Sequence, residues 1–146
     1  MHLASLSADY KQISNLDVQI GDLGLGTRNQ KPATMENTHT LLNLTDIKEL
    51  EPLPGYSVRF VHSENLTFAF WDIKKGYAVP VHSHPNEQVV KILEGKLELS
   101  LEDETYIMEP GQVLVIPANV EHAAFSHTDC KAIDTFYPVR EDYKNL

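Results

Sequence analysis

From Tyr56 onward, short runs of strand-forming residues alternate with turns that contain glycine or proline. About eight such runs at regular spacing are typical of a β-sandwich or a β-barrel. The clearest run is 96–101, in which leucines and polar residues alternate strictly, so that one face is apolar. The expected strands cover residues 57–62, 66–74, 77–81, 88–93, 96–101, 105–108, 113–116, 122–127 and 131–137. The sequence therefore predicts an all-β fold.

The residues before Tyr56 follow other patterns. Apolar residues recur at steps of three or four over residues 1–20, which predicts an amphipathic helix, with a partly disordered arm as the alternative. These apolar residues are Leu3, Leu6, Tyr10, Ile13, Leu16 and Ile20. The glycine-rich segment 21–40 matches neither common phosphate-binding pattern and is interpreted as a linker.

The segment 45–51 is expected to form one or two helical turns that begin at Thr45 and end before Pro52 and Pro54. We therefore expect an N-terminal extension over residues 1–40, made of a helix and a linker. A single β-barrel domain is expected over residues 41–146.

The composition narrows the classes of partner. A formal net charge of −9 argues against binding to nucleic acid or to an anionic membrane, since both select basic surfaces. The single cysteine, Cys130, excludes an internal disulfide and fits a reducing compartment. The N-terminal residues lack the pattern of a secretory signal, and no stretch approaches the length of a membrane span. A cytoplasmic location is the default expectation.

Two histidines lie two residues apart among these strands. In a β-strand, the side chains of residues i and i+2 leave the same face, so His82 and His84 can converge on one point inside a concave sheet. A third histidine, His122, follows a later strand. These residues predict a metal ion held inside a small barrel. The alternative is a barrel that has kept the pattern and lost the metal.

Two spaced motifs resemble those of the cupin superfamily. The first motif runs from Gly76 through His82, His84 and Gln88 to Gly95, and the second runs from Gly111 through Pro117 and Asn119 to His122. The resemblance covers about residues 40–142. It implies a double-sheet jelly-roll barrel with a divalent metal ion, which could be Zn, Ni, Mn or Fe. The implied ligands are His82, His84, Gln88 and His122.

The motifs depart from the family pattern at three positions. Gln88 stands where the family usually has Glu, and strand alternation favours Gln88 over the neighbouring Glu87, which points the opposite way. Asn119 replaces a glycine, and asparagine tolerates a left-handed backbone better than most residues. Ser126 replaces an asparagine at a position that is not a ligand.

A glutamine at position 88 affects which metal chemistry the site favours. Three neutral imidazoles and a neutral amide leave a divalent ion its full charge, which favours Lewis-acid chemistry. By contrast, two histidines with one carboxylate suit iron that activates oxygen. Gln88 therefore favours non-redox chemistry and does not exclude a dioxygenase.

The end of the chain adds three candidate residues. Asp134 and Phe136 share one face of their strand, and an acid on the inner face near a metal is a candidate general acid or base. Arg140 could bind a substrate carboxylate through its planar fork. The alternative is that Asp134 caps a turn and that Arg140 pairs with Glu141 or Asp142 on the surface.

A closer resemblance favours the functional interpretation. The run from His82 to Gln88, the stretch 116–124 and the ending 134–142 are similar to the pectin- and alginate-degradation cupins. These proteins convert 4,5-unsaturated monouronates into linear keto sugars. The resemblance implies catalytic roles for Asp134, Phe136 and Arg140 and a carboxylate sugar as the small-molecule substrate.

Three functional classes stay open. The first is a metal-dependent isomerase or lyase that acts on a sugar acid. The second is an iron-dependent dioxygenase or other oxidoreductase, and the third is a non-catalytic module that senses a small molecule or a metal. The strand 113–116 is apolar on both faces, which is expected for a strand covered twice. A homodimer that pairs through this strand is therefore expected.

Overall fold

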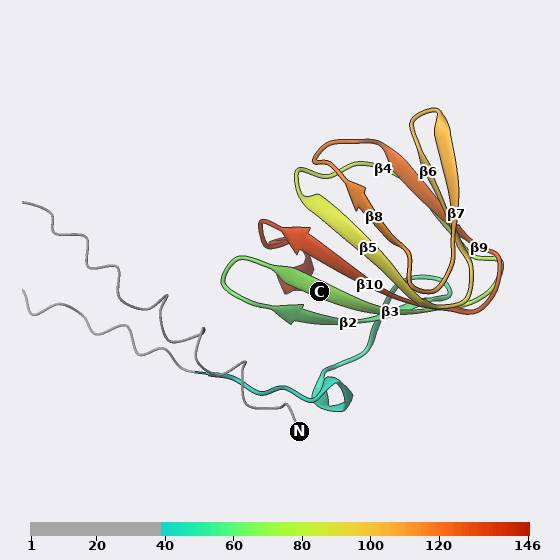
Figure 1. The fold of residues 1–146 in the computed structure, drawn as a ribbon. Coiled ribbons are helices and arrows are strands. Elements are labelled where there is room, and N and C mark those ends of the chain that lie inside the picture. The colour runs from blue at the N-terminus through green and yellow to red at the C-terminus, as the bar shows by residue number, and fades with distance from the viewer. Residues whose placement is uncertain (1–38) are drawn as a thin grey trace, which may run out of the picture. The chain divides into compact units, whose positions relative to one another are not determined.

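Two antiparallel β-sheets face each other across a common interior (Figure 1). The structure is a computed structural model that describes residues 39–146, and residues 40–146 form one compact unit. Its strands are β1 (Leu50–Leu53), β2 (Tyr56–His62), β3 (Thr67–Ile73), β4 (Ala78–His82), β5 (Glu87–Glu94), β6 (Leu97–Leu101), β7 (Glu104–Met108), β8 (Val113–Ile116), β9 (His122–Ser126) and β10 (Cys130–Tyr137). Short 3-10 helices cover Leu44–Asp46 and Tyr143–Asn145. The expected helix in 1–20 and most of the expected linker lie outside the described residues.

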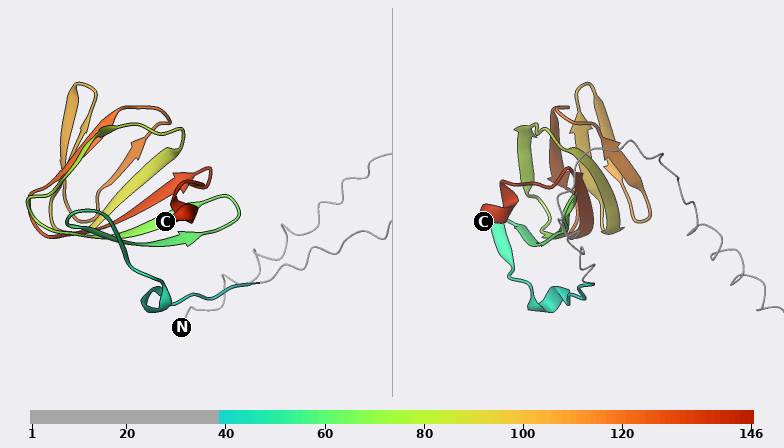
Figure 2. Two further views of the ribbon diagram at one scale, coloured as in Figure 1. Left: turned by 180° about the vertical axis from the view of Figure 1, so that it is seen from behind. Right: turned by 90° about the vertical axis from the view of Figure 1, so that its left-hand side faces the viewer.

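The strands are ordered as in a jelly roll. The six-stranded sheet has the order β1-β2-β3-β10-β5-β8, and the four-stranded sheet has the order β4-β9-β6-β7 (Figures 1 and 2). Neighbouring strands of the described residues pair in antiparallel fashion. The all-β prediction is confirmed, and each expected strand from β2 to β10 is found within one residue at either end. Within the described residues, none of the helices could cross a membrane.

The helix expected over 45–51 is wrong for most of its length. Only Leu44–Asp46 forms a helical turn, and Leu50–Leu53 forms the edge strand β1. Pro52 is compatible with this strand because an edge strand has one side without ladder hydrogen bonds. A tight turn at Gly55, with a φ of +75°, brings β1 back against β2. Pairing with β2 therefore overrides the local helical pattern.

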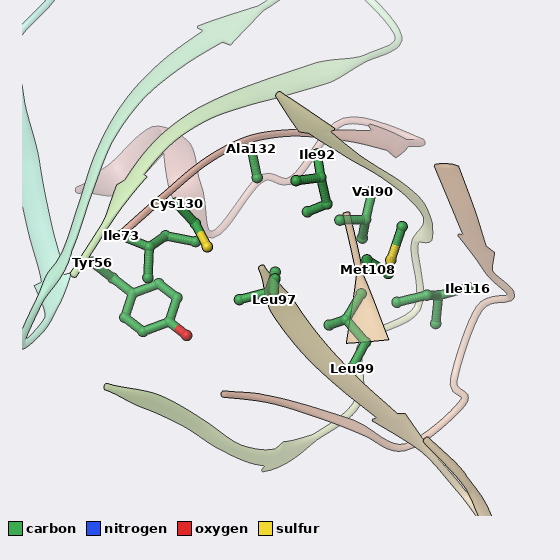
Figure 3. Close-up of a cluster of buried hydrophobic side chains, with 10 residues drawn as sticks. All are labelled: Tyr56, Ile73, Val90, Ile92, Leu97, Leu99, Met108, Ile116, Cys130 and Ala132. Carbon is green, nitrogen blue, oxygen red and sulfur yellow. The ribbon is translucent and has the colours of Figure 1, made fainter. Parts of the chain in front are cut away.

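The interior between the sheets is apolar over most of its extent. Val90 and Ile92 from β5 meet Leu97 and Leu99 from β6, as Figure 3 shows. Since side chains alternate along a strand, the inward face of β5 that holds Val90 and Ile92 also holds Gln88. The buried core and one candidate ligand therefore share a single strand face.

The strand β8 is buried on one face only. Ile116 is buried and Leu114 is half-buried on the inner face, whereas Val113 and Val115 are more than half exposed on the outer face. β8 also lies at the edge of its sheet. The expectation that both faces of β8 are covered is therefore not met within this single chain, and the outer face is available to a partner.

Candidate metal centre

The three motif histidines converge in the barrel. His82 ends β4 and His122 begins β9, and the two residues are register partners in the β4–β9 pair. His84 lies in the loop between β4 and β5. The ligand atoms of the three rings all lie within 4.8 Å of one another. The two-residue spacing therefore brings the imidazole rings of His82 and His84 together, as expected from a strand, although His84 lies just beyond the end of β4.

A left-handed turn in the second motif contacts the first motif through a backbone hydrogen bond. Asn119 has a φ of +64°, as expected from its place where the family has glycine. Its backbone N–H donates a hydrogen bond to the carbonyl oxygen of His84 over 2.8 Å. This bond fixes the loop before β9 against the loop that carries His84. The turn therefore positions His84 and His122 together.

Backbone carbonyl groups set the tautomer of each ring. The Nδ1 atoms of His82, His84 and His122 lie 2.9, 3.0 and 2.9 Å from the carbonyl oxygens of Pro80, Asn86 and Val120, respectively. A carbonyl oxygen can only accept, so each Nδ1 must carry the proton. Each neutral ring then presents an unprotonated Nε2 atom, which is the usual arrangement for imidazole bound to a metal.

Burial keeps two of the rings neutral. Desolvation lowers the pKa of His84 and of His122 below the ordinary histidine value. The Nε2 atom of His122 is buried and has no hydrogen-bond partner among the described residues. A buried lone pair without a partner is costly, and a cation bound among the rings would relieve that cost.

Gln88 completes the donor set. Its side chain is buried on the inner face of β5, whereas Glu87 is exposed, in agreement with strand alternation. The Oε1 atom of Gln88 lies 3.0 Å from the Nε2 atom of His84. With the proton of His84 on Nδ1, both of these atoms are acceptors, and a shared cation would bring them together. Two neighbouring ligands of an octahedral ion, each bound at about 2.1 Å, lie about 3.0 Å apart.

These four groups fit a divalent metal ion. Three imidazole nitrogens suit zinc, iron and nickel, and an amide oxygen is a common additional ligand. Histidines 82, 84 and 122 could hold such an ion by themselves. The donor set contains no carboxylate, so it would not reduce the charge of the ion.

A buried carboxylate lies beside Gln88. Asp134 is on the inner face of β10, opposite Val90 of β5. Burial raises the pKa of Asp134 to about 7, while hydrogen bonds from Trp71 and Gln88 and the charge of Arg140 act in the opposite direction. The Nε1 atom of Trp71 donates to Oδ2 of Asp134 over 2.9 Å. Asp134 therefore lies in the barrel interior and does not cap a turn.

The guanidinium group of Arg140 is buried and already paired. Its Nε and Nη2 atoms donate to Asp142 over 2.9 and 2.7 Å, and its plane lies 3.9 Å from the ring centroid of Tyr143. The pairing with Asp142 is the alternative considered from the sequence, but Arg140 is only 7% exposed. Its Nη1 atom is buried and has no partner among the described residues. Nη1 is therefore unpaired within the described residues, and Arg140 is not among the residues that line the cavity at the histidines.

Phe136 separates the histidines from Arg140. Its side chain is 2% exposed, and its ring meets the ring of His84 edge to face at 5.4 Å between centroids. The guanidinium carbon of Arg140 lies 5.0 Å from the centroid of Phe136. In this structure, Phe136 therefore packs against the histidine cluster.

A cavity of about 420 Å³ opens onto the candidate metal centre. The three histidines, Gln88 and Asp134 line it, together with mainly apolar side chains such as Leu97 and Leu99. The hydroxyl group of Tyr56 also lies at this cavity, buried and without a partner, and points toward the interior (Figure 3). Burial raises the pKa of Tyr56 to about 12, so this group remains a hydrogen-bond donor.

Sequence reasoning missed three aromatic residues at this site. Trp71 binds Asp134, Tyr143 stacks on Arg140, and Tyr56 places a hydroxyl group at the cavity. The strand alternation of β3 places Trp71 on the inward face with Ala69 and could have identified it. Nothing in the local sequence marks Tyr143, since it follows the last strand.

Comparison with known proteins agrees with this fold. Residues 69–136 match the family model described as the Cupin domain. The solved structure of KdgF from Halomonas sp. is 24% identical with a TM-score of 0.67, over 71% of this chain and 99% of that one. An RmlC-like cupin from Shewanella frigidimarina NCIMB 400 is 23% identical with a TM-score of 0.68, over 73% and 96% of the two chains.

A metal-containing enzyme also shares the fold. Bacillus subtilis oxalate decarboxylase, a protein with Mn(II) centres, is 20% identical with a TM-score of 0.58, over 69% of this chain and 31% of that one. No curated protein matches the chain. The residues matched by the family model include the four candidate ligands and Asp134, whereas Arg140 lies beyond them.

Proposed function

We propose that this chain, whose residues 69–136 match the Cupin domain model, is a metal-dependent enzyme that acts on a small sugar acid. One observation carries the proposal. Three unprotonated imidazole nitrogens, the oxygen of Gln88 and the buried carboxylate of Asp134 all line one cavity. This arrangement combines a metal site with a group that can move a proton.

The donor set favours Lewis-acid chemistry. The candidate ligands His82, His84, His122 and Gln88 are all neutral, so a divalent ion would keep its charge and would supply polarisation of a substrate oxygen. A carboxylate ligand, which would stabilise ferric iron, is absent from this set. We therefore propose non-redox catalysis and retain an iron-dependent dioxygenase as the alternative. The metal could be Zn, Ni, Mn or Fe.

The proposed substrate is a 4,5-unsaturated monouronate. The support is the resemblance of the motifs to the pectin- and alginate-degradation cupins, together with a KdgF structure among the similar folds. Conversion of this ring to a linear keto sugar is an isomerisation. The proton of the anomeric hydroxyl group leaves, the bond from the anomeric carbon to the ring oxygen breaks, and the resulting enolate takes a proton on carbon.

Asp134 and Arg140 have separate roles in this proposal. The carboxylate of Asp134 accepts the hydroxyl proton and returns it to carbon, so no other reactant is needed. The buried Nη1 atom of Arg140 supplies positive charge for the substrate carboxylate. Phe136 packs between His84 and Arg140 and helps to exclude water. This local positive charge offsets the repulsion of an anion by a protein of net charge −9.

The first test is turnover of the unsaturated substrates. Metal-replete protein mixed with monouronates derived from galacturonan or alginate is expected to remove the ultraviolet absorbance of the enol-ether double bond. The rate should exceed that of metal-stripped protein by more than about 100-fold, since a Lewis acid contributes several kcal/mol. Equal rates for replete and stripped protein on every such substrate would rule out the reaction.

Oxygen consumption that requires ferrous iron would instead support the dioxygenase. Binding of an unchanged ligand would support a sensing module.

The outer face of β8 is proposed to pair with a second copy of this chain. β8 lies at the edge of its sheet, carries no charged residue, and exposes Val113 and Val115. Exposed apolar residues on one face of a sheet favour packing against a partner, and a two-fold axis would place the outer face of β8 against its own copy. An uncharged contact also avoids repulsion between two chains of net charge −9.

We also propose a cytoplasmic location, which fits the buried free thiol of Cys130.

The homodimer has its own test. Val115→Asp would place a carboxylate in the interface, and burial of an unpaired charge costs several kcal/mol. The dimer dissociation constant, measured by analytical ultracentrifugation, is expected to rise by more than about 100-fold. Ile107→Asp is the control, since Ile107 is equally exposed on the edge strand β7 of the other sheet. A wild-type protein that stays monomeric, or an equal effect of both variants, would contradict the proposed interface.

A further inference from the structure

The side chain of Gln88 can serve as a ligand in only one of its two orientations. The oxygen and nitrogen atoms of an amide have nearly the same shape, but only the oxygen has a lone pair for a metal ion. A rotation of about 180° at the end of the side chain would place the NH₂ group against the histidines. The orientation of the amide must therefore be selected by its other neighbours.

The carboxylate of Asp134 is the neighbour that selects it. Gln88 and Asp134 lie on adjacent strands and on the same inward face, since Gln88 is the register partner of Phe136, two residues after Asp134. The two side chains face each other across the β5–β10 pair. Burial raises the pKa of Asp134, and hydrogen bonding with the side chain of Gln88 acts in the opposite direction. Oδ2 of Asp134 already accepts from Trp71, and a carboxylate oxygen that accepts attracts the NH₂ group rather than the oxygen of the amide. The oxygen of Gln88 then faces the opposite way, where it lies 3.0 Å from Nε2 of His84.

Trp71 holds the carboxylate in place. Its indole N–H can only donate, and it binds Oδ2 of Asp134 over 2.9 Å. The indole ring is held between two aromatic rings that meet it nearly at right angles, with centroids 6.0 Å away for Tyr56 and 6.1 Å away for Phe60. This packing limits rotation of the indole, so the carboxylate receives the Trp71 donor from a fixed direction.

We propose that Trp71 and Asp134 are positioning residues that orient the amide of Gln88 so that its oxygen faces the three imidazoles. The inference rests on the metal site of the proposed function and is independent of the reaction. Partners that orient a metal ligand from outside the coordination sphere typically contribute 10- to 100-fold to metal affinity. Asp134 thus has a role in metal binding in addition to the proton transfer proposed above.

The test measures the affinity of the metal-stripped protein for Co(II), by chelator competition and by the visible absorbance of the bound ion. In Asp134→Asn, the new amide can accept from Trp71 through its oxygen, and its NH₂ group then faces Gln88. The amide of Gln88 is expected to rotate, and the affinity should fall by about 10- to 100-fold. Trp71→Phe removes one of the two donors and should lower the affinity by about 3- to 10-fold. Asp72→Asn, at an exposed carboxylate of β3, is the control and should leave the affinity unchanged.

A second substitution distinguishes rotation of the Gln88 amide from a general disturbance of the site structure. Glu has two equivalent oxygens, so Asp134→Asn combined with Gln88→Glu should restore the affinity to at least the wild-type value. Thermal unfolding of the metal-free variants checks that each one folds. Wild-type affinity in Asp134→Asn would overturn the inference, because a residue that only carries protons does not affect metal binding. Failure of Gln88→Glu to restore the affinity would also overturn it. A wild-type protein without Co(II) binding would refute the metal site, whereas a lack of turnover on uronates would refute only the reaction.

Discussion

Replacement of His122 by alanine is expected to abolish retention of the metal. The Nε2 atom of His122 is buried, has no partner, and lies within 4.8 Å of the ligand atoms of the other two histidines. Its Nδ1 atom is already held by the carbonyl oxygen of Val120. The variant therefore loses a ligand whose tautomer and direction are preset. The affinity for Co(II) should fall by more than the roughly 100-fold that loss of an outer-sphere partner costs.

Elemental analysis of the purified protein checks this expectation, together with a titration of the stripped protein. His127→Ala is the matched control, because His127 follows the same strand, β9, and its Nε2 atom pairs with Glu98 over 2.7 Å. This variant should retain the metal at the wild-type level. Metal retained by His122→Ala at the wild-type stoichiometry, or lost equally by both variants, would show that the ion binds elsewhere.

Most of the fold could be predicted because its signals are local. The alternation of Leu97 and Leu99 with polar residues specifies a strand with one buried face, as the structure shows. Gly76, Gly95 and Gly111 mark turns, and all three have a positive φ. The edge strand β1 could not be predicted. The preceding segment 45–51 has a helical pattern, and the pairing of β1 with β2 depends on the turn between these two strands.

The candidate site also combines local sequence signals with contacts between residues far apart in the sequence. The two-residue spacing of His82 and His84 is a local signal, whereas His122 joins them only through the register of β4 and β9. The family resemblance supplied that link. The hydrogen bond between Trp71 and Asp134 joins residues 63 positions apart and belongs to no motif. The pairing of Arg140 with Asp142 is an alternative that the sequence allows, but the burial of the Arg140 side chain depends on packing against Tyr143.

Gly95, in the turn between β5 and β6, is expected to be the least tolerant glycine position of the two histidine motifs. A Cβ atom at Gly95 would lie 2.2 Å from the backbone oxygen of Asp129 and 2.7 Å from the Sγ atom of Cys130. The residue also has a φ of +84°. Gly95→Ala should lower the free energy of unfolding by more than about 3 kcal/mol, since backbone strain and a clash with backbone atoms add.

Gly76→Ala separates these two contributions. Gly76 has nearly the same φ, +85°, but a Cβ atom there would meet nothing within 4 Å. This variant should lose only about 1–2 kcal/mol, the cost of the left-handed backbone. Urea unfolding of the two metal-free variants measures the difference, which is the cost of the clash. Equal destabilisation would show that the contact of Gly95 with residues 128–130 is not tight. Because β10 begins at Cys130, the clash should also displace the strand that carries Asp134, and Gly95→Ala alone should weaken Co(II) binding.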